Sequence, residues 1–75
     1  MTLDNLIHMA NQIGYFFEAM PDRDEAMAGV TQHLRNYWDP RMRRELARHV
    51  LESDGAGLSP FTLAALRARP LMNPA

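Results

Sequence analysis

Two dipeptides, Asp39-Pro40 and Ser59-Pro60, constrain the fold most strongly, because each places an N-capping residue directly before a proline. Proline is tolerated at the first helical position, where its missing amide would have no partner and its fixed φ suits the first turn. Each pair therefore predicts the start of a helix. Further breaks fall at residues 21–22 and 53–57, and between all these breaks the apolar residues recur with a helical and not an alternating period.

The pattern predicts an all-α fold, a small bundle of three main helices plus a short C-terminal fourth helix. The expected helices cover residues 3–20, 22–38, 40–51 and 60–68. A chain of 75 residues is long enough for one small domain only. We expect a single helical domain over residues 1–69 and a C-terminal tail over residues 70–75, because Arg69-Pro70 stops the last helix.

The first helix is apolar over about half of its circumference, by helical-wheel arithmetic. One face is expected to pack internally: Leu3, Leu6, Ile7, Ala10, Ile13, Gly14 and Phe17. Met9, Phe16 and Met20 widen the apolar side beyond what a single packing seam needs. We therefore predict that this flank contacts a partner.

The second helix opens with a capping box, in which Asp22 is the N-cap and Glu25 follows three residues later. Its inward stripe is predicted to contain Ala26, Met27, Val30, Leu34, Tyr37 and Trp38. Trp38 ends this stripe just before the turn, so it is expected to be largely buried against the first and third helices.

The third helix separates its apolar and basic residues. Met42, Leu46 and Val50 share one face, and the opposite face carries Arg41, Arg44 and Arg48. Gly55 and Gly57 are expected to end the helix, because glycine accepts the left-handed conformation used after helix C-termini.

The fourth helix is apolar on nearly every side, which predicts that it is covered on more than one side. We expect one side of it to be exposed in the isolated chain or buried in a partner, because a large exposed apolar patch usually marks an interaction surface. The predicted contact residues are Phe61, Leu63 and Leu66.

The composition excludes several classes of function. The chain is 47% hydrophobic, which excludes a wholly disordered segment, and it contains no cysteine and no lysine. Disulfides, zinc-thiolate sites, thiol nucleophiles and Schiff-base chemistry are therefore absent. The net charge of -1 provides no general attraction to nucleic acid or anionic lipid.

Membrane insertion and export are not expected either. No stretch approaches the roughly 20 apolar residues that span a bilayer, and polar residues interrupt the first 20 positions, where a signal peptide needs an apolar core. A cytoplasmic location is the resulting expectation.

No catalytic, metal-binding or cofactor-binding residue is predicted. The histidines His8, His33 and His49 lie one to a helix, without the close spacing of a metal-binding pair. The two serines, Ser53 and Ser59, occupy turn or cap positions, so neither is a good candidate for the nucleophile of a serine triad. The acidic residues Asp22, Asp24 and Glu25 are interpreted as a helix start, where acids interact favourably with the macrodipole.

The segment from Tyr37 to Arg44 is the strongest local signal. One interpretation is a helix-helix corner, with Trp38 filling the core and Asp39 capping. The other adds an interface at the same corner, because tryptophan and arginine are enriched among interface hot spots. The two interpretations remain open. A DNA-recognition helix is less favoured, because Glu45 lies among the arginines and the helix lacks asparagine and glutamine.

These residues resemble the small delta subunit of cytoplasmic NAD-dependent formate dehydrogenases. Three blocks, in the family's order, carry the resemblance across nearly the whole chain, and Trp38-Asp39-Pro40-Arg41-Met42 is the most specific part of them. The blocks are Leu6-Ile7-His8-Met9-Ala10-Asn11-Gln12-Ile13 with Phe16-Phe17, Tyr37-Trp38-Asp39-Pro40-Arg41-Met42-Arg43, and Gly57-Leu58-Ser59-Pro60 followed by residues 63–66. Members often carry alanine where Gly14 stands here, a difference expected to loosen the first helix.

The resemblance implies a non-catalytic accessory subunit of an enzyme that oxidises formate to carbon dioxide and reduces NAD. In that family the molybdenum or tungsten pterin and most iron-sulfur clusters belong to the large alpha subunit, and flavin and NAD chemistry to the beta and gamma subunits. The implied partner is therefore the large alpha subunit, and the chain itself is expected to bind no cofactor. Absence of cysteine agrees, because iron-sulfur clusters are held by thiolates.

Two alternatives to this function remain. The chain could be a helix-turn-helix module for nucleic acid, or a free-standing helical adapter or homodimer that buries its apolar flank against itself. Whether it acts during cofactor insertion or stays in the finished enzyme is also open.

Overall fold

The computed structural model describes residues 1–72 of the chain and contains four α-helices and no strand within them. The helices are α1 (Leu3–Glu18), α2 (Arg23–Tyr37), α3 (Pro40–Ser53) and α4 (Pro60–Ala68). The predicted all-α fold with a short fourth helix is confirmed. Four ends differ from the prediction: α1 stops two residues earlier than expected, α2 is one residue shorter at each end, and α3 continues two residues further.

Each helix begins with a side chain that accepts a hydrogen bond from a backbone amide of the first turn. The predicted caps Asp22, Asp39 and Ser59 all do this, and Thr2 adds a fourth cap at the start of α1. Asp39 Oδ1 accepts from Met42 N at 2.9 Å, and the proline that follows it occupies the first turn of α3. These caps satisfy donors that no helical carbonyl can reach.

The end of α3 uses three left-handed residues. Asp54 takes this conformation first, with φ of 53°, followed by Gly55 at 67° and Gly57 at 91°. The C-cap position predicted for glycine is occupied by Asp54; Gly55 follows it with positive φ, and Gly57 lies further along the loop towards α4. Gly55 is also needed for space, because a Cβ there would lie 2.6 Å from the Leu63 side chain.

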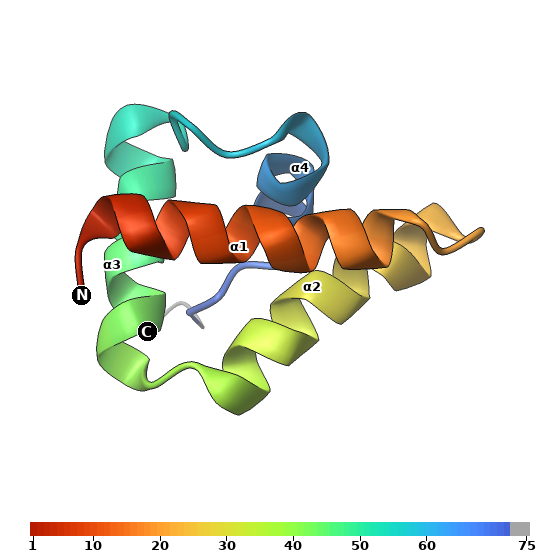
Figure 1. The fold of residues 1–75 in the computed structure, drawn as a ribbon, viewed down its shortest axis with the longest axis horizontal. Coiled ribbons are helices and arrows are strands. Elements are labelled where there is room, and N and C mark those ends of the chain that lie inside the picture. The colour runs from red at the N-terminus through yellow and green to blue at the C-terminus, as the bar shows by residue number, and fades with distance from the viewer. Residues whose placement is uncertain (73–75) are drawn as a thin grey trace.

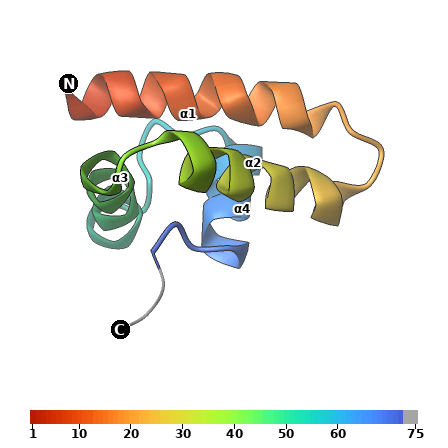
Figure 2. The ribbon, with the colours of Figure 1, turned by 90° about the horizontal axis from the view of Figure 1, so that it is seen from below.

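The helix α1 lies across the other three helices (Figure 1). It packs against α2, α3 and α4, and α4 in turn packs against both α2 and α3. Figure 2 shows α1 as one layer along the edge of the molecule, with α2, α3 and α4 on the same side of it. The short fourth helix therefore has packed neighbours in all three of the longer helices.

The hydrophobic core is built around α4. Phe61, Ala65 and Leu66 are buried in it, together with residues from the three other helices and from the segment after α4: Leu6, Ala10, Ala26, Val30, Leu34, Trp38, Leu46 and Leu71. Leu63 is half-buried. The expectation that one side of this helix stays uncovered is thus wrong for Phe61 and Leu66, because α1, α2 and α3 together cover it.

A close approach of α1 and α4 occurs at Gly14. This glycine is buried, and a Cβ at its position would collide with the Thr62 hydroxyl. Thr62 is itself completely buried, and its hydroxyl accepts a hydrogen bond from Ser59 Oγ at 2.8 Å. The glycine is therefore required for contact between two helices, which is a more specific role than the expected loosening of α1.

The end of α2 separates two neighbouring aromatic residues. Trp38 is only 6% exposed, which confirms its predicted burial, whereas Tyr37 is 76% exposed and its predicted inward position is wrong. The backbone becomes extended at Trp38, with φ of -90° and ψ of 141°. This change directs Trp38 into the core, whereas Tyr37 is still helical and lies on the same side of α2 as His33, four residues earlier.

The segment after α4 is anchored to the domain. Thr31 Oγ1 donates to the Arg69 carbonyl and Arg35 donates to the Pro70 carbonyl, each at 2.7 Å. These bonds place Leu71 in the core with 3% exposure. The predicted tail over residues 70–75 is therefore wrong for residues 70 and 71, and its last three residues lie outside the described part of the chain.

Candidate partner-binding surfaces

The outward side of α3 carries the predicted arginines Arg41, Arg44 and Arg48, and all three are exposed. Arg48 forms an ion pair with Glu52, with 2.9 Å between Nε and Oε2. Arg41 and Arg44 have no ion pair among residues 1–72. The structure thus brings the three arginines to one surface and leaves two of them without an acidic partner there.

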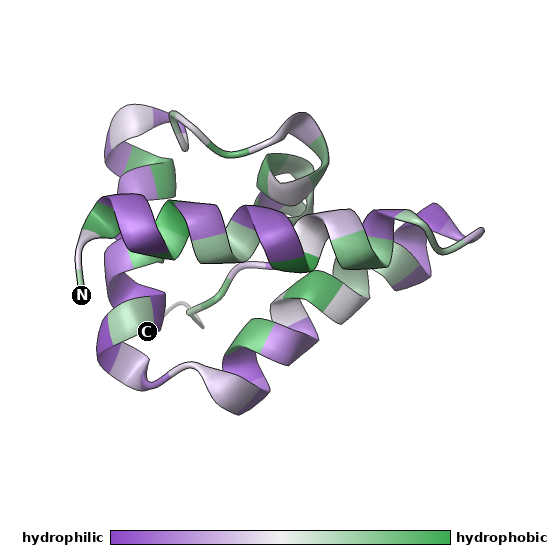
Figure 3. Cartoon of the chain, in the orientation of Figure 1, coloured by the Kyte–Doolittle hydropathy of each residue, from purple (hydrophilic) through white to green (hydrophobic). Residues whose placement is uncertain are grey.

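Charge is unevenly distributed along the sequence. The helix α3 contains four arginines and two glutamates, whereas the rest of the chain contains four arginines and seven acidic residues. In Figure 3 the ribbon of α3 is largely purple, in keeping with this composition. The helix α3 is therefore basic and the rest of the chain is acidic, although the chain as a whole has a net charge of -1.

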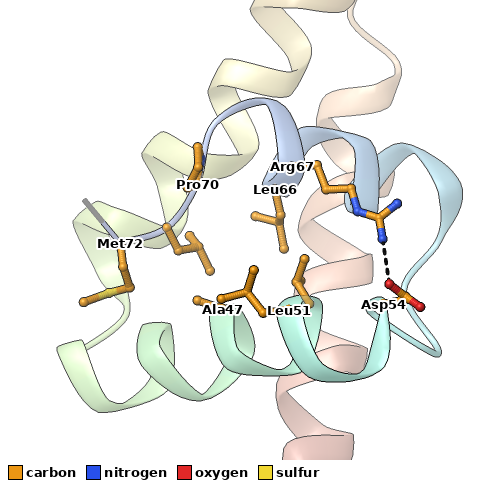
Figure 4. Close-up of a pocket in the computed structure, with 9 residues that line it drawn as sticks. Ala47, Leu51, Asp54, Leu66, Arg67, Pro70 and Met72 are labelled. Carbon is orange, nitrogen blue, oxygen red and sulfur yellow. Dashed lines mark hydrogen bonds and ion pairs between the residues drawn. The ribbon is translucent and has the colours of Figure 1, made fainter. Parts of the chain in front are cut away.

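Leu51 lies on the same helix and is 84% exposed, the highest exposure of the large apolar residues in the described chain. A hollow of about 360 Å³ opens beside it, between α3, α4 and the segment after α4 (Figure 4). Its walls are mainly apolar, and it is lined by Ala47, Val50, Leu51, Asp54, Leu66, Arg67, Pro70, Leu71 and Met72. Arg67 and Asp54 form an ion pair of 3.4 Å at its edge.

A second hollow continues along α3 from the first. The two share Ala47, Leu51 and Met72, and the second is also lined by Arg41, Arg44, Glu45, Arg48 and Glu52. We call the combined depression the α3 groove, defined by the residues that line the two hollows. It joins the exposed arginines to an apolar region, which the spacing of the arginines alone does not predict.

The predicted flank of α1 is only partly exposed. Phe16 is 73% exposed and Met20 is exposed, but Met9 is half-buried against the core. Aromatic rings extend the flank onto α2, with ring centroids of Phe16 and Phe17 5.2 Å apart and those of Phe17 and His33 6.1 Å apart. The ring of His33 lies 4.7 Å from that of Tyr37.

We call these residues the aromatic surface: Phe16, Phe17, Met20, His33 and Tyr37. The contribution of α2 to this surface was not predicted. The spacing of His33 and Tyr37, four residues apart on one helix, is the signal that could have indicated it.

Asn11, which belongs to the first of the three blocks noted in the sequence, links α1 to the loop between α3 and α4. Its amide donates to the Gly57 carbonyl at 2.9 Å, and its Oδ1 accepts from Ser59 N at 2.8 Å. Asn11 therefore holds the loop between α3 and α4 against α1. The first and third of the blocks noted in the sequence are joined by these two bonds.

The predicted contact residues thus lie in different environments, and Met9 and Leu63 are half-buried. Arg41, Arg44 and Arg48 share the α3 groove, and Phe16 and Met20 lie on the aromatic surface. Trp38, Phe61 and Leu66 are buried, and Asp39 caps α3. The interpretation of the corner as a structural element is supported for Trp38 and Asp39, because a cap and a core residue account for both.

Within residues 1–72, no three histidine or acidic side chains are grouped so as to hold a metal ion. The same residues contain no helix with the length and apolarity needed to cross a bilayer.

Comparison with known proteins gives one match. The family described as the NADH-dependent formate dehydrogenase delta subunit FdsD matches residues 5–66, a span that includes α2 and α3 entirely and most of α1 and α4. Searches of curated proteins and of solved structures find no significant match. With this match over most of its length, the chain belongs to the delta subunit family of NADH-dependent formate dehydrogenase.

Proposed function

We propose that this chain is a non-catalytic accessory subunit of a cytoplasmic NAD-dependent molybdenum or tungsten formate dehydrogenase. It binds the large alpha subunit and stabilises it or helps it to mature. Family membership supports a place in the complex. The observation that carries the binding role is the exposed side of α3, where Arg41 and Arg44 have no ion pair among the described residues.

The proposed chemistry of binding is charge-assisted. Arginine presents a planar fork of donors that matches a carboxylate, and such pairs are stronger than hydrogen bonds between neutral groups. Because Arg41 and Arg44 are already on the surface, a partner carboxylate could reach them without rearrangement of the core. Binding of the folded large subunit would raise its stability by mass action.

The chain is proposed to hold none of the enzyme's cofactors. The donor set does not fit an iron-sulfur cluster, because the sequence contains no cysteine. It also does not fit a metal centre built from several histidines or carboxylates, since the described residues form no such group. The proposal therefore assigns the redox chemistry to the other subunits.

The test is a pull-down of the tagged chain from its native host, with identification of the subunits that co-purify. We expect the large alpha subunit in the eluate. Arg44→Glu should reduce its recovery while the helix content measured by circular dichroism stays unchanged, because Arg44 is exposed. Arg69→Glu is the matched control, since it makes the same charge change outside the α3 groove.

The rival functions give different results in this experiment. A chain that elutes without dehydrogenase subunits, as a homodimer or with bound DNA, would contradict the proposed function. The cofactor content of the co-purified large subunit also separates two roles: a permanent subunit would be recovered with cofactor-loaded enzyme, and a maturation factor with enzyme that lacks its cofactor.

A further inference from the structure

We propose that the α3 groove is the docking site for an amphipathic helix of the large subunit that carries carboxylates beside an apolar side chain. This inference rests on the proposed function and goes beyond it, because it specifies the surface and the chemistry of the partner segment. Three features of the groove determine that chemistry: its unpaired arginines, its exposed leucine and its own glutamates.

The first feature is charge. Arg41 and Arg44 lie three residues apart on the exposed side of α3, and Arg48 follows four residues later. At 1.5 Å per residue, the span from Arg41 to Arg48 is about 10 Å, or two helical turns. A partner helix with acidic residues at a spacing of three and four would present its carboxylates over the same distance.

The second feature is the apolar part of the groove. Leu51 is almost fully exposed, so its side chain adds little to the stability of the isolated domain. It lies where the two hollows meet, and Leu66, Leu71 and Met72 line the region beside it. Figure 4 shows Leu51 and Leu66 on facing walls of this hollow. An apolar side chain of the partner would fill the hollow and cover Leu51.

The third feature distinguishes a protein segment from nucleic acid. Glu45 and Glu52 line the groove between and beside the arginines. A continuous row of phosphates along the groove would meet these carboxylates as well as the arginines, and like charges at close range repel. A helix with separate acidic residues and an apolar anchor can avoid them.

The aromatic surface is a poorer match for the same segment. The hollow there, of about 280 Å³, is lined by Gln12, Ile13, Phe16, Phe17 and His33 and has no arginine. It therefore provides apolar contact without a complement for carboxylates, and charge complementarity selects the α3 groove.

The experiment measures the affinity of the purified chain for the purified large subunit. Leu51→Gln and Arg44→Glu should each weaken binding about tenfold or more, the size of effect seen at interface hot spots. The controls are Tyr37→Gln, which removes a similarly exposed large side chain elsewhere, and Arg69→Glu. Both should bind within about twofold of the unmodified chain. In the absence of the large subunit, the Leu51→Gln chain should unfold at the same thermal midpoint as the unmodified chain.

The outcomes separate this inference from the proposed function. If the unmodified chain does not bind the large subunit, both are overturned. If it binds but the Leu51 and Arg44 variants bind equally well, the docking site alone is wrong. Loss of affinity in Tyr37→Gln and Phe16→Gln with no loss in Leu51→Gln would move the site to the aromatic surface. Binding of a DNA duplex near physiological salt, abolished by Arg44→Glu, would also overturn the inference.

Discussion

The helices α3 and α4 begin in the same way and end up in opposite environments. Each opens with a capping side chain followed by proline in the first turn. Yet α3 fully buries only Leu46 among its 14 residues, whereas α4 buries Phe61, Thr62, Ala65 and Leu66 among nine. The capping signal fixes where a helix starts, and the distribution of its apolar residues determines how many neighbours cover it.

This difference separates structural residues from candidate contact residues. The contacts of α4 are made within the chain, and Asn11 forms hydrogen bonds to the loop just before this helix. These internal contacts account for two of the three blocks that carry the family resemblance. The exposed side of α3 has arginines and a leucine without comparable internal contacts. The contrast predicts that α4 variants lower stability and α3 groove variants lower binding.

The largest effect is expected at the end of α2, where a buried and an exposed aromatic residue are adjacent. Trp38→Ala should unfold the isolated chain, because truncation of a buried aromatic costs about 3–5 kcal/mol, comparable with the stability of a small domain. Tyr37→Ala should change the free energy of unfolding by less than about 0.5 kcal/mol. A dispersed NMR spectrum from Trp38→Ala would show that the core does not depend on this ring.

The next largest effect compares two leucines across one hollow. Leu66→Ala should lower the free energy of unfolding by about 2–5 kcal/mol, because it leaves a cavity in the core. The same change at Leu51 should cost less than about 0.5 kcal/mol, since this side chain is exposed. Urea unfolding of both variants measures the difference, and equal losses would contradict the assignment of Leu51 to a contact surface.

A smaller loss of stability is expected when the hydrogen bonds between Asn11 and the loop that connects α3 to α4 are removed. Asn11→Ala should lower the free energy of unfolding by about 1–3 kcal/mol, because the Gly57 carbonyl and the Ser59 amide each lose a partner. Asn36→Ala is the control, since Asn36 only accepts a hydrogen bond from Gln32 on the exposed surface of α2. Hydrogen exchange at Ser59 should accelerate in the first variant and stay unchanged in the second.

The smallest and most specific effect concerns the contact of α1 with α4. Gly14→Ala should cost about 1–3 kcal/mol from overpacking against Thr62, partly offset by about 0.5–1 kcal/mol of helix propensity. Adding Thr62→Ala should remove the collision. The double variant is therefore expected to be more stable than the sum of the single effects, which a double-mutant cycle measures by thermal unfolding. Strict additivity would show that the two positions do not touch.

Local signals were sufficient to predict the fold class. Capping at Asp22, Asp39 and Ser59 depends on neighbouring residues only, so it could be read directly from the sequence. Burial of Trp38 followed from the apolar stripe that it ends. The position of Tyr37 was mispredicted, because it lies three residues after Leu34 and four after His33, so helical spacing alone fits both an inward and an outward position.

Long-range contacts account for what the sequence could not provide. The expected exposure of Phe61 and Leu66 in α4 was wrong because the other helices cover them, and the arrangement of those helices is not a local property. The hydrogen bonds of Asn11 and of Thr31 join residues 38 or more positions apart. At the candidate surface, the arginines of α3 could be predicted from their spacing, but the adjoining hollow needed Leu71 and Met72 to fold back onto α3.

The central position of α4 also has a consequence for the order of synthesis. This helix is the last of the four to be made, and at about 5–20 residues per second roughly 3–13 s separate the appearance of α1 from the completion of α4. During that interval Val30, Leu34 and Leu46 lack the helix that completes their core. The hydrophobic core that the first three helices share with α4 is therefore complete only after α4 has been synthesised.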